Sequence, residues 1–165
     1  MQRRIRLITA PALAAVTLLL LTVSASAQWH GRHWQPQQIQ NLYCSAPAYI
    51  VPFEPRNAGI NIGPNGYVIT IASALSGDPA TVRALLAHEC GHVIHKHGMH
   101  NLSGRMIQHN ELQADCTAAR LLMHRNDRAG LAALIKSVGR CGPVPSGHPA
   151  YPTCDERRER IRACS

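Results

Sequence analysis

The first half of the chain carries short runs of apolar and β-branched residues separated by turn signals. Residues 49–51 are Tyr-Ile-Val flanked by prolines, which predicts a short edge strand. Apolar and polar side chains alternate over residues 60–62, and Pro-Asn-Gly at 64–66 separates them from the β-branched stretch 67–72. The pattern predicts a β-hairpin, or two adjacent strands, over residues 60–72.

Farther along, apolar residues recur with the 3.6-residue period of an α-helix. Asp78-Pro79 predicts a helix start, because Asp caps free N–H groups and the first turn does not need the donor that Pro lacks. Helices are expected from there to about Lys96, over 108–124, from Asp127 to about Val138, and over 155–163. Strands followed by helices indicate a small α+β domain, mostly helical, with a short antiparallel sheet beside the first helix.

The N-terminus has the features of an export signal. Three arginines within the first six residues precede a mostly apolar stretch, which ends at the small-residue cleavage signal Ala25-Ser26-Ala27. We predict a signal peptide over residues 1–27 and a periplasmic or secreted protein. A retained membrane anchor is the alternative, because the apolar stretch nearly reaches the ~20 residues of a span. After cleavage, no later segment is expected to span a membrane.

The composition of the remaining chain divides it into a polar arm and a folded domain. Residues 28–43 are rich in Gln and His and predict a polar N-terminal arm, although residues 39–42 could begin a helix. Residues 44–165 are then the folded domain.

The net charge of +8 includes the three arginines of the leader, and aromatic residues make up only 4% of the chain. Without a basic stripe or a stacking platform, we expect no nucleic-acid partner.

Six cysteines follow the predicted leader, and an even number in an exported protein suggests disulfides. The sequence leaves their pairing open. Cys90 lies inside the first of the motifs described next and Cys116 directly follows the second, so they are expected to be either a bridge or two buried thiols. Cys154 and Cys164 flank the last predicted helix and are placed to tether it. The cysteines are Cys44, Cys90, Cys116, Cys141, Cys154 and Cys164.

The motif His-Glu-Cys-Gly-His at residues 88–92 lies inside the first predicted helix. His88 and His92 are four residues apart, so both imidazoles lie on one helix face and can bind a single metal ion. Glu89 is next to the first ligand and can reach a metal-bound water. Zn²⁺ lowers the pKa of such a water to about 7, which lets Glu89 act as a general base.

A catalytic zinc site needs a third protein ligand and an open position. Glu111 lies on the next predicted helix and is the best candidate. Asp115 lies four residues later on the same face. There it can accept a hydrogen bond from the outer nitrogen of a ligand histidine, which is the ring nitrogen that does not bind the metal. Because the surrounding residues are apolar, these carboxylates should be largely buried, and buried carboxylates need a metal or another cation.

These two segments resemble a known family. Residues 88–97 read HECGHVIHKH and residues 110–115 read NELQAD. They are similar to the H-E-x-G-H and E-x-x-A-D motifs of gluzincin metallopeptidases, in particular the CAAX prenyl proteases and the HtpX-type and periplasmic peptidases. The resemblance implies zinc ligation by His88, His92 and Glu111, with Glu89 as the base. His97 matches a histidine that is common in the family.

The resemblance also implies a zincin-like fold, in which an edge strand pairs with an extended substrate. His148-Pro149 matches a family pair whose histidine steadies the oxyanion, so His148 is a candidate catalytic residue. The family arginine corresponds to Arg157 or Arg160, because extra residues at 151–154 change the spacing. Apart from this match, the histidines at 95, 97 and 100 are expected to form a polar helix end.

Together these features predict an exported zinc-dependent endopeptidase that acts on a peptide or protein substrate. The alternative is a zinc-retaining, chaperone-like or peptide-binding envelope protein with little proteolytic activity. A purely structural zinc would normally have four protein ligands, whereas the sequence offers three and a base, which favours catalysis. The sequence does not predict the oligomeric state or the natural substrate.

Overall fold

The structure is a computed structural model that describes residues 35–52, 58–98, 104–138 and 151–165. All of them belong to the second of the two units into which the chain divides, residues 33–165. The predicted signal peptide, His148 and Cys141 lie outside the described residues.

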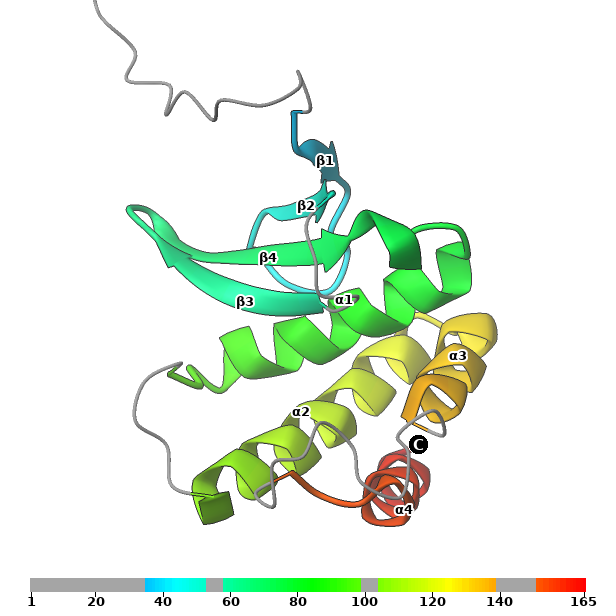
Figure 1. The fold of residues 1–165 in the computed structure, drawn as a ribbon. Coiled ribbons are helices and arrows are strands. Elements are labelled where there is room, and N and C mark those ends of the chain that lie inside the picture. Colours follow the sequence, from blue (N-terminus) through cyan, green and yellow to red (C-terminus); the bar gives the residue numbers. More distant parts are fainter. Residues whose placement is uncertain (1–34, 53–57, 99–103, 139–150) are drawn as a thin grey trace, which may run out of the picture. The chain divides into compact units, whose positions relative to one another are not determined.

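Four strands form one sheet in the order β1-β2-β4-β3 (Figure 1). The predicted hairpin is confirmed, because β3 (Ala58–Gly63) pairs antiparallel with β4 (Gly66–Ala72) across a tight turn. Gly66 closes this turn with φ of 111°, a left-handed conformation that favours glycine. Among the described strands, β3 therefore lies at one edge of the sheet, with β4 as its neighbour.

The other two strands differ from expectation. β2 (Ala48–Val51) lies inside the sheet and pairs parallel with β4, so the sheet is mixed and β2 is not an edge strand. The flanking prolines allow this because they lie just outside the strand, where the carbonyl of Pro47 still accepts from the Ile69 amide at 2.9 Å. β1 (Gln37–Ile39) comes from the segment predicted as a polar arm and pairs antiparallel with β2.

The helices follow the sheet in sequence and confirm the α+β prediction. A short 3-10 turn (Ser73–Leu75) leads into α1 (Pro79–Ile94), which is followed by α2 (Gly104–His124), α3 (Arg128–Val138) and α4 (Cys154–Cys164). Figure 1 shows α1 between the sheet and the other helices. Within the described ranges, no helix has the length and apolar character needed to cross a membrane.

Caps fix where three of these helices begin. The side chain of Asp78 accepts from two amides of the first turn of α1, as its sequence predicts. The side chain of Asp127 caps α3 by accepting from the Gly130 amide at 2.8 Å. Thr153 and Glu156 form a reciprocal capping box at the start of α4.

The core lies between the sheet and α1 and continues among the helices. Ile69 and Ile71 of β4, Leu122 of α2 and Ile161 of α4 are fully buried members of one hydrophobic cluster. Burying each of these side chains stabilises the fold by about 1.5–3 kcal/mol. Small residues on α1 and α2 complete the cluster and let the helices pack closely, among them Ala84, Ala87, Ala118 and Ala119.

Among the described residues, two disulfides cross-link the domain, one between α1 and the segment before β2 and the other between α2 and α4. Cys44 is bonded to Cys90, and Cys116 is bonded to Cys164, with sequence separations of 46 and 48. Loops of this length restrict the unfolded chain enough to stabilise the fold by about 4 kcal/mol each in the chain-entropy model. Cys164 thus tethers the last helix, as expected, whereas the Cys90–Cys116 bridge is wrong. Cys90 lies on a face of α1 turned toward the segment before β2, and Cys116 faces α4.

Candidate metal and catalytic site

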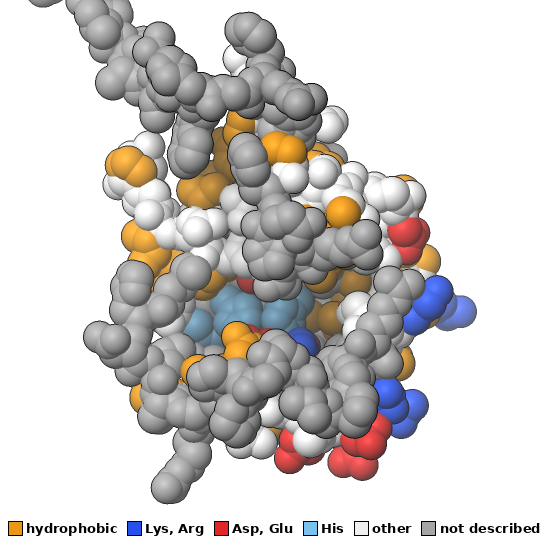
Figure 2. Space-filling view, in the orientation of Figure 1, with side chains coloured by type: hydrophobic (Ala, Val, Ile, Leu, Met, Phe, Trp, Pro, Cys, Tyr) orange, Lys and Arg blue, Asp and Glu red, His pale blue; other side chains and the backbone are white. Residues whose placement is uncertain are grey.

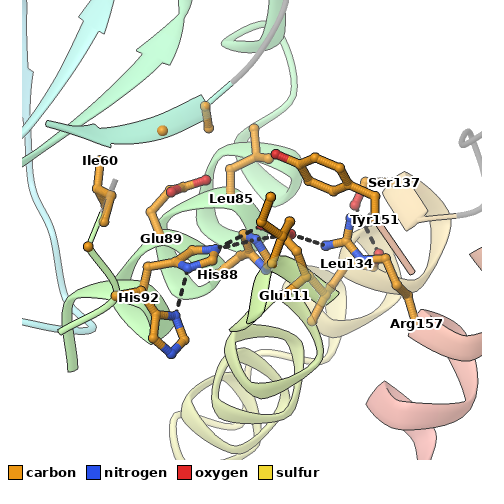
Figure 3. A pocket seen from close by; sticks show the side chains of 15 residues that line it. Ile60, Leu85, His88, Glu89, His92, Glu111, Leu134, Ser137, Tyr151 and Arg157 are labelled. Atoms are coloured by element: carbon orange, nitrogen blue, oxygen red, sulfur yellow. Dashed lines mark hydrogen bonds and ion pairs between the residues drawn. The ribbon is translucent and has the colours of Figure 1, made fainter. Parts of the chain in front are cut away.

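The three predicted metal ligands lie together between α1 and α2. Nε2 of His88 is 3.1 Å from Nε2 of His92 and 3.4 Å from Oε2 of Glu111. Nε2 of His92 is 3.5 Å from Oε1, the other oxygen of the same carboxylate. Figure 3 shows the two imidazoles and the carboxylate pointing toward one another. These donor atoms form a group that could hold a metal ion. In Figure 2, histidine side chains gather in a hollow on this face of the molecule.

A close helix crossing sets this geometry. Gly91 lies between the two ligand histidines and faces α2, where a Cβ would come within 2.8 Å of the Cα and carbonyl oxygen of Ala114. Ala114 in turn lies between Glu111 and Asp115 on the face of α2 that meets α1. The smallest residues of the two motifs therefore form the contact that brings the ligands within reach of one another.

Asp115 lies next to His88, on the side of its ring that faces away from His92 and Glu111, and has no exposed surface. Its Oδ1 is 2.9 Å from Nδ1 of His88, so it faces the outer nitrogen of a candidate ligand as the sequence predicts. Arg157 of α4 binds the same carboxylate through both of its oxygens, at 2.7 and 2.8 Å, and also lies 3.5 Å from Glu111. Arg157 is thus the arginine of this site, while the exposed Arg160 lines a separate surface pocket.

His97 supports the second ligand in the same way. Its Nδ1 is 2.9 Å from Nδ1 of His92, and its Nε2 is 3.0 Å from Oε1 of Gln113. Because the amide oxygen only accepts, Nε2 of His97 carries the hydrogen, and its Nδ1 accepts from Nδ1–H of His92. This assignment leaves a lone pair on Nε2 of His92, directed toward the other two candidate ligands.

His97 lies just past the end of α1, as expected, but it is turned inward, with only 8% of it exposed. Lys96 takes a left-handed conformation with φ of 54°, and the His97 amide donates to the carbonyl of His92. This turn folds the chain back against α1 and brings the His97 ring under His92. His95 remains on the surface, where it contacts Thr117.

Burial and neighbouring charges set the protonation of the cluster. Burial lowers the pKa of His88 most strongly, but the carboxylates of Asp115 and Glu111 outweigh it and raise the pKa to about 10. For His92, burial and the charge on His88 lower the pKa to about 3. Burial raises the pKa of Glu111 and of Asp115, yet the adjacent cations bring both to about 2. At neutral pH both carboxylates are therefore ionised and His92 is neutral.

Glu89 stands apart from this cluster. Its side chain is 6% exposed and, within the described part of the chain, makes no hydrogen bond or ion pair. Burial is the main reason that its pKa rises to about 7, with His88 and Arg157 acting in the opposite direction and Glu111 adding to the rise. A carboxylate of this pKa can accept and release a proton near neutral pH.

A cavity of about 490 Å³ connects Glu89 with the ligand cluster. The edge strand β3 forms one wall through Ala58, Gly59 and Ile60, and Leu134 and Ser137 of α3 lie on another side. Tyr151 also lines the cavity, a residue for which the sequence offered no role beyond its place in the extra segment 151–154. The arrangement places a buried glutamate, a group of donors that could hold a metal ion and the edge strand of the described sheet around one space.

The chain was also compared with known proteins. A scan against protein-family models finds no match, and searches of curated proteins and of solved structures find none. The resemblance to CAAX prenyl proteases and HtpX-type peptidases therefore rests on the two motifs, and the function of the chain has to be argued from its own residues.

Proposed function

We propose that the chain is an exported, zinc-dependent endopeptidase with His88, His92 and Glu111 as metal ligands and Glu89 as the general base. The observation that carries this proposal is the spacing of the donor atoms. Two ligands held about 2.0–2.1 Å from a tetrahedral zinc ion lie about 3.3 Å apart. The two imidazole nitrogens are 3.1 Å apart, and each lies 3.4–3.5 Å from one oxygen of the Glu111 carboxylate, Oε2 for His88 and Oε1 for His92, which is close to the edge length of such a tetrahedron.

The chemistry of the donors also fits zinc, which accepts imidazole and carboxylate ligands readily. Each ligand histidine has a partner for its outer nitrogen, as metal-binding histidines usually do: Asp115 for His88 and His97 for His92. Structural zinc sites close all four positions with protein groups, whereas this group of described residues contains three. The donor set therefore favours a catalytic site over a structural one.

Zinc bound at these residues would polarise a carbonyl group and acidify water. Glu89 then accepts a proton from the attacking water, whose oxygen forms a bond to the scissile carbonyl carbon. The carbon–nitrogen bond breaks, and Glu89 delivers the same proton to the leaving nitrogen. The pKa of Glu89 near 7 suits both transfers, because neither the acid nor the carboxylate form is strongly preferred.

A peptide substrate is supported by the edge of the sheet. In the described sheet β3 is an edge strand beside β4, and three of its residues line the cavity. An extended peptide can pair with such an edge through main-chain hydrogen bonds, which places its backbone across the space that Glu89 faces. The two disulfides support export, because disulfides persist in oxidising compartments.

The strand edge alone would equally serve a protein that binds peptides without cleaving them. Glu89 separates the two functions, because a binder has no use for a buried carboxylate that faces the cavity without a protein partner among the described residues. The test incubates purified protein, lacking residues 1–27, with a peptide mixture and identifies products by mass spectrometry. Wild type is compared with Glu89→Gln and with Glu159→Gln, which changes an exposed glutamate of α4.

We expect new peptide termini with wild type and with Glu159→Gln, and none with Glu89→Gln, while all three proteins carry equal zinc. Cleavage by Glu89→Gln at the wild-type rate would exclude the proposed base. Stoichiometric zinc in wild type without any cleavage would instead support the peptide-binding alternative.

A further inference from the structure

A second, smaller pocket of about 310 Å³ lies between α2 and α4 and shares none of its described lining residues with the cavity at the metal site. Two arginines and three other side chains with N–H or O–H groups line it, and the described lining includes no carboxylate. The side chains with donor groups are His95, Gln113, Thr117, Arg120 and Arg160. The pocket therefore combines positive charge with hydrogen-bond donors.

Helical spacing and a disulfide bring these groups together. Thr117 and Arg120 are three residues apart along α2, so they lie on the same helix face. Arg160 lies on α4, and the bond between Cys116 and Cys164 joins the two helices at the pocket itself. This link limits how far the two helices can move apart, so the groups are held together before any ligand binds.

Neither arginine of the pocket has an acidic partner among the described residues. Arg120 has no Asp or Glu within four residues along α2. Arg160 has Glu156 one turn earlier on α4, but that carboxylate accepts from Thr153 in the capping box. A single solvated arginine indicates no ligand, whereas here two line one hollow together with neutral donors. Both positive charges are thus available to an anion.

The pair of His95 and Thr117 adds a directed donor. Nε2 of His95 is 2.8 Å from Oγ1 of Thr117. When this nitrogen carries the hydrogen, the hydroxyl accepts it and keeps its own hydrogen for a further acceptor. The ring of His95 also stacks on that of His97, with centroids 5.5 Å apart, which fixes its orientation. The pair can therefore offer an O–H group to an anion that the arginines hold.

We propose that this pocket binds a phosphate monoester group, carried by a soluble molecule or by a lipid headgroup. Such a group has a charge of about −1.5 to −2 at pH 7 and three strong acceptor oxygens, which match two guanidinium groups and the neutral donors. Guanidinium groups bind phosphate through paired N–H···O bonds. A carboxylate has one charge and two oxygens, so it would leave more of these donors without a partner.

The volume of the pocket lies within the range of small-molecule sites, about 300–1,000 Å³, which leaves space for the group that carries the phosphate. The inference uses no residue of the proposed metal site and does not depend on peptidase activity.

The test titrates phenyl phosphate by calorimetry into the purified protein lacking residues 1–27. We expect one site per chain and an affinity at least about tenfold higher than that for benzoate, which carries a carboxylate on the same ring. Arg120→Gln and Arg160→Gln should each weaken phosphate binding about tenfold or more, because each removes a charged hydrogen-bond donor.

Two control variants separate the pocket from other sources of binding. Arg162→Gln makes the same change in net charge at an exposed arginine of α4 outside the pocket, and it should bind phenyl phosphate as wild type does. Glu111→Gln tests the metal site, because a phosphate could also bind zinc, and it should retain the affinity as well. The melting temperatures of the variants of Arg120, Arg160 and Arg162 should equal that of wild type.

Vesicles identify the source of the phosphate. Cosedimentation with phosphatidylcholine vesicles that contain phosphatidic acid, but not with phosphatidylcholine alone, would assign the group to a lipid, provided that Arg120→Gln and Arg160→Gln abolish it. Binding of phenyl phosphate without cosedimentation would assign it to a soluble molecule.

Absence of binding to both phenyl phosphate and the vesicles would overturn the proposal. So would an equal loss in Arg162→Gln, because the phosphate would then respond to net charge and not to the pocket. Binding that is lost in Glu111→Gln but kept in the pocket variants would place the phosphate at the metal site, and equal affinity for benzoate would show that the pocket does not select phosphate. Either result would also contradict the inference.

Discussion

Gly91 of α1 lies directly against the backbone of Ala114 in α2, so close that a Cβ on Gly91 would be 2.8 Å from the Ala114 carbonyl oxygen. The residue after Gly91 is the candidate ligand His92, and the residue after Ala114 is the buried Asp115. The contact therefore determines the distance between the histidines of α1 and the carboxylates of α2.

Gly91→Ala should force α1 and α2 apart. Overpacking of this kind costs about 1–3 kcal/mol, and backbone atoms of Ala114 cannot move aside as a flexible side chain can. Because the ligands also move, the rise in melting temperature on adding zinc should be smaller than in wild type. Calorimetry with and without zinc measures both effects. Gly77→Ala, at a position with open space, is the control, and equal behaviour of both variants would contradict this account.

His97 should act as a positioning residue through His92. His97→Ala removes the acceptor that fixes the tautomer of His92, and loss of such an outer partner typically weakens metal binding 10- to 100-fold. Competition with a chromophoric chelator measures the affinity, and the visible spectrum of the cobalt-substituted protein reports the ligand geometry. The exposed His124 provides the control His124→Ala. An unchanged affinity and cobalt spectrum in His97→Ala would show that His97 has no positioning role.

The Cys116–Cys164 disulfide should be needed to hold Arg157 in the site. Replacing both cysteines by serine removes the covalent link between α2 and α4 and should lower the free energy of unfolding by up to about 4 kcal/mol. Zinc affinity should fall as well, since α4 carries the guanidinium that binds Asp115 and Glu111. Denaturant unfolding and chelator competition test the two effects, and full zinc affinity in the double variant would contradict the second.

The stability of the fold should depend on pH through Asp127. This carboxylate accepts from Arg83, Tyr43 and Gly130, and Arg83 is the main reason that its pKa lies below the usual value. A lowered pKa stabilises the fold above the pKa of the unfolded chain, about 3.9, and this contribution is lost as pH falls through the lower folded value.

Asp127→Asn keeps the helix cap and removes the charge. The variant should be less stable than wild type at pH 7, and the difference should shrink toward zero as the pH is lowered below 3.9. Because Arg83 is 37% exposed, the effect at pH 7 should be modest. Denaturant unfolding at several pH values measures it, and a difference that stays constant down to the folded pKa would rule out the charge as its source.

Local sequence signals predicted much of the fold. The hairpin, the helix starts at Asp78 and Asp127, and the pairing of His88 with His92 depend on short-range patterns: a turn, a cap and the spacing along a helix face. Each of these features lies within a few residues of the signal that predicts it, which explains why they appear in the structure close to where they were expected.

Features that depend on distant parts of the chain were missed. The cysteine pairing depends on which face of each helix meets which neighbour, and no local signal reports this. The inward turn of His97 depends on a left-handed Lys96, an uncommon conformation for lysine. The choice of Arg157 over Arg160 depends on how α4 packs against α2. The place of β2 inside the sheet depends on its parallel pairing with β4, from which it is separated in the sequence by β3.

The most direct test of the central claim is the zinc content of the purified protein, measured by mass spectrometry after dialysis against zinc-depleted buffer. Wild type and the control Glu159→Gln should retain one zinc ion per chain, and Glu111→Gln should retain much less, because it replaces a charged ligand of the proposed site. Wild type without zinc, or Glu111→Gln with as much zinc as wild type, would contradict the account.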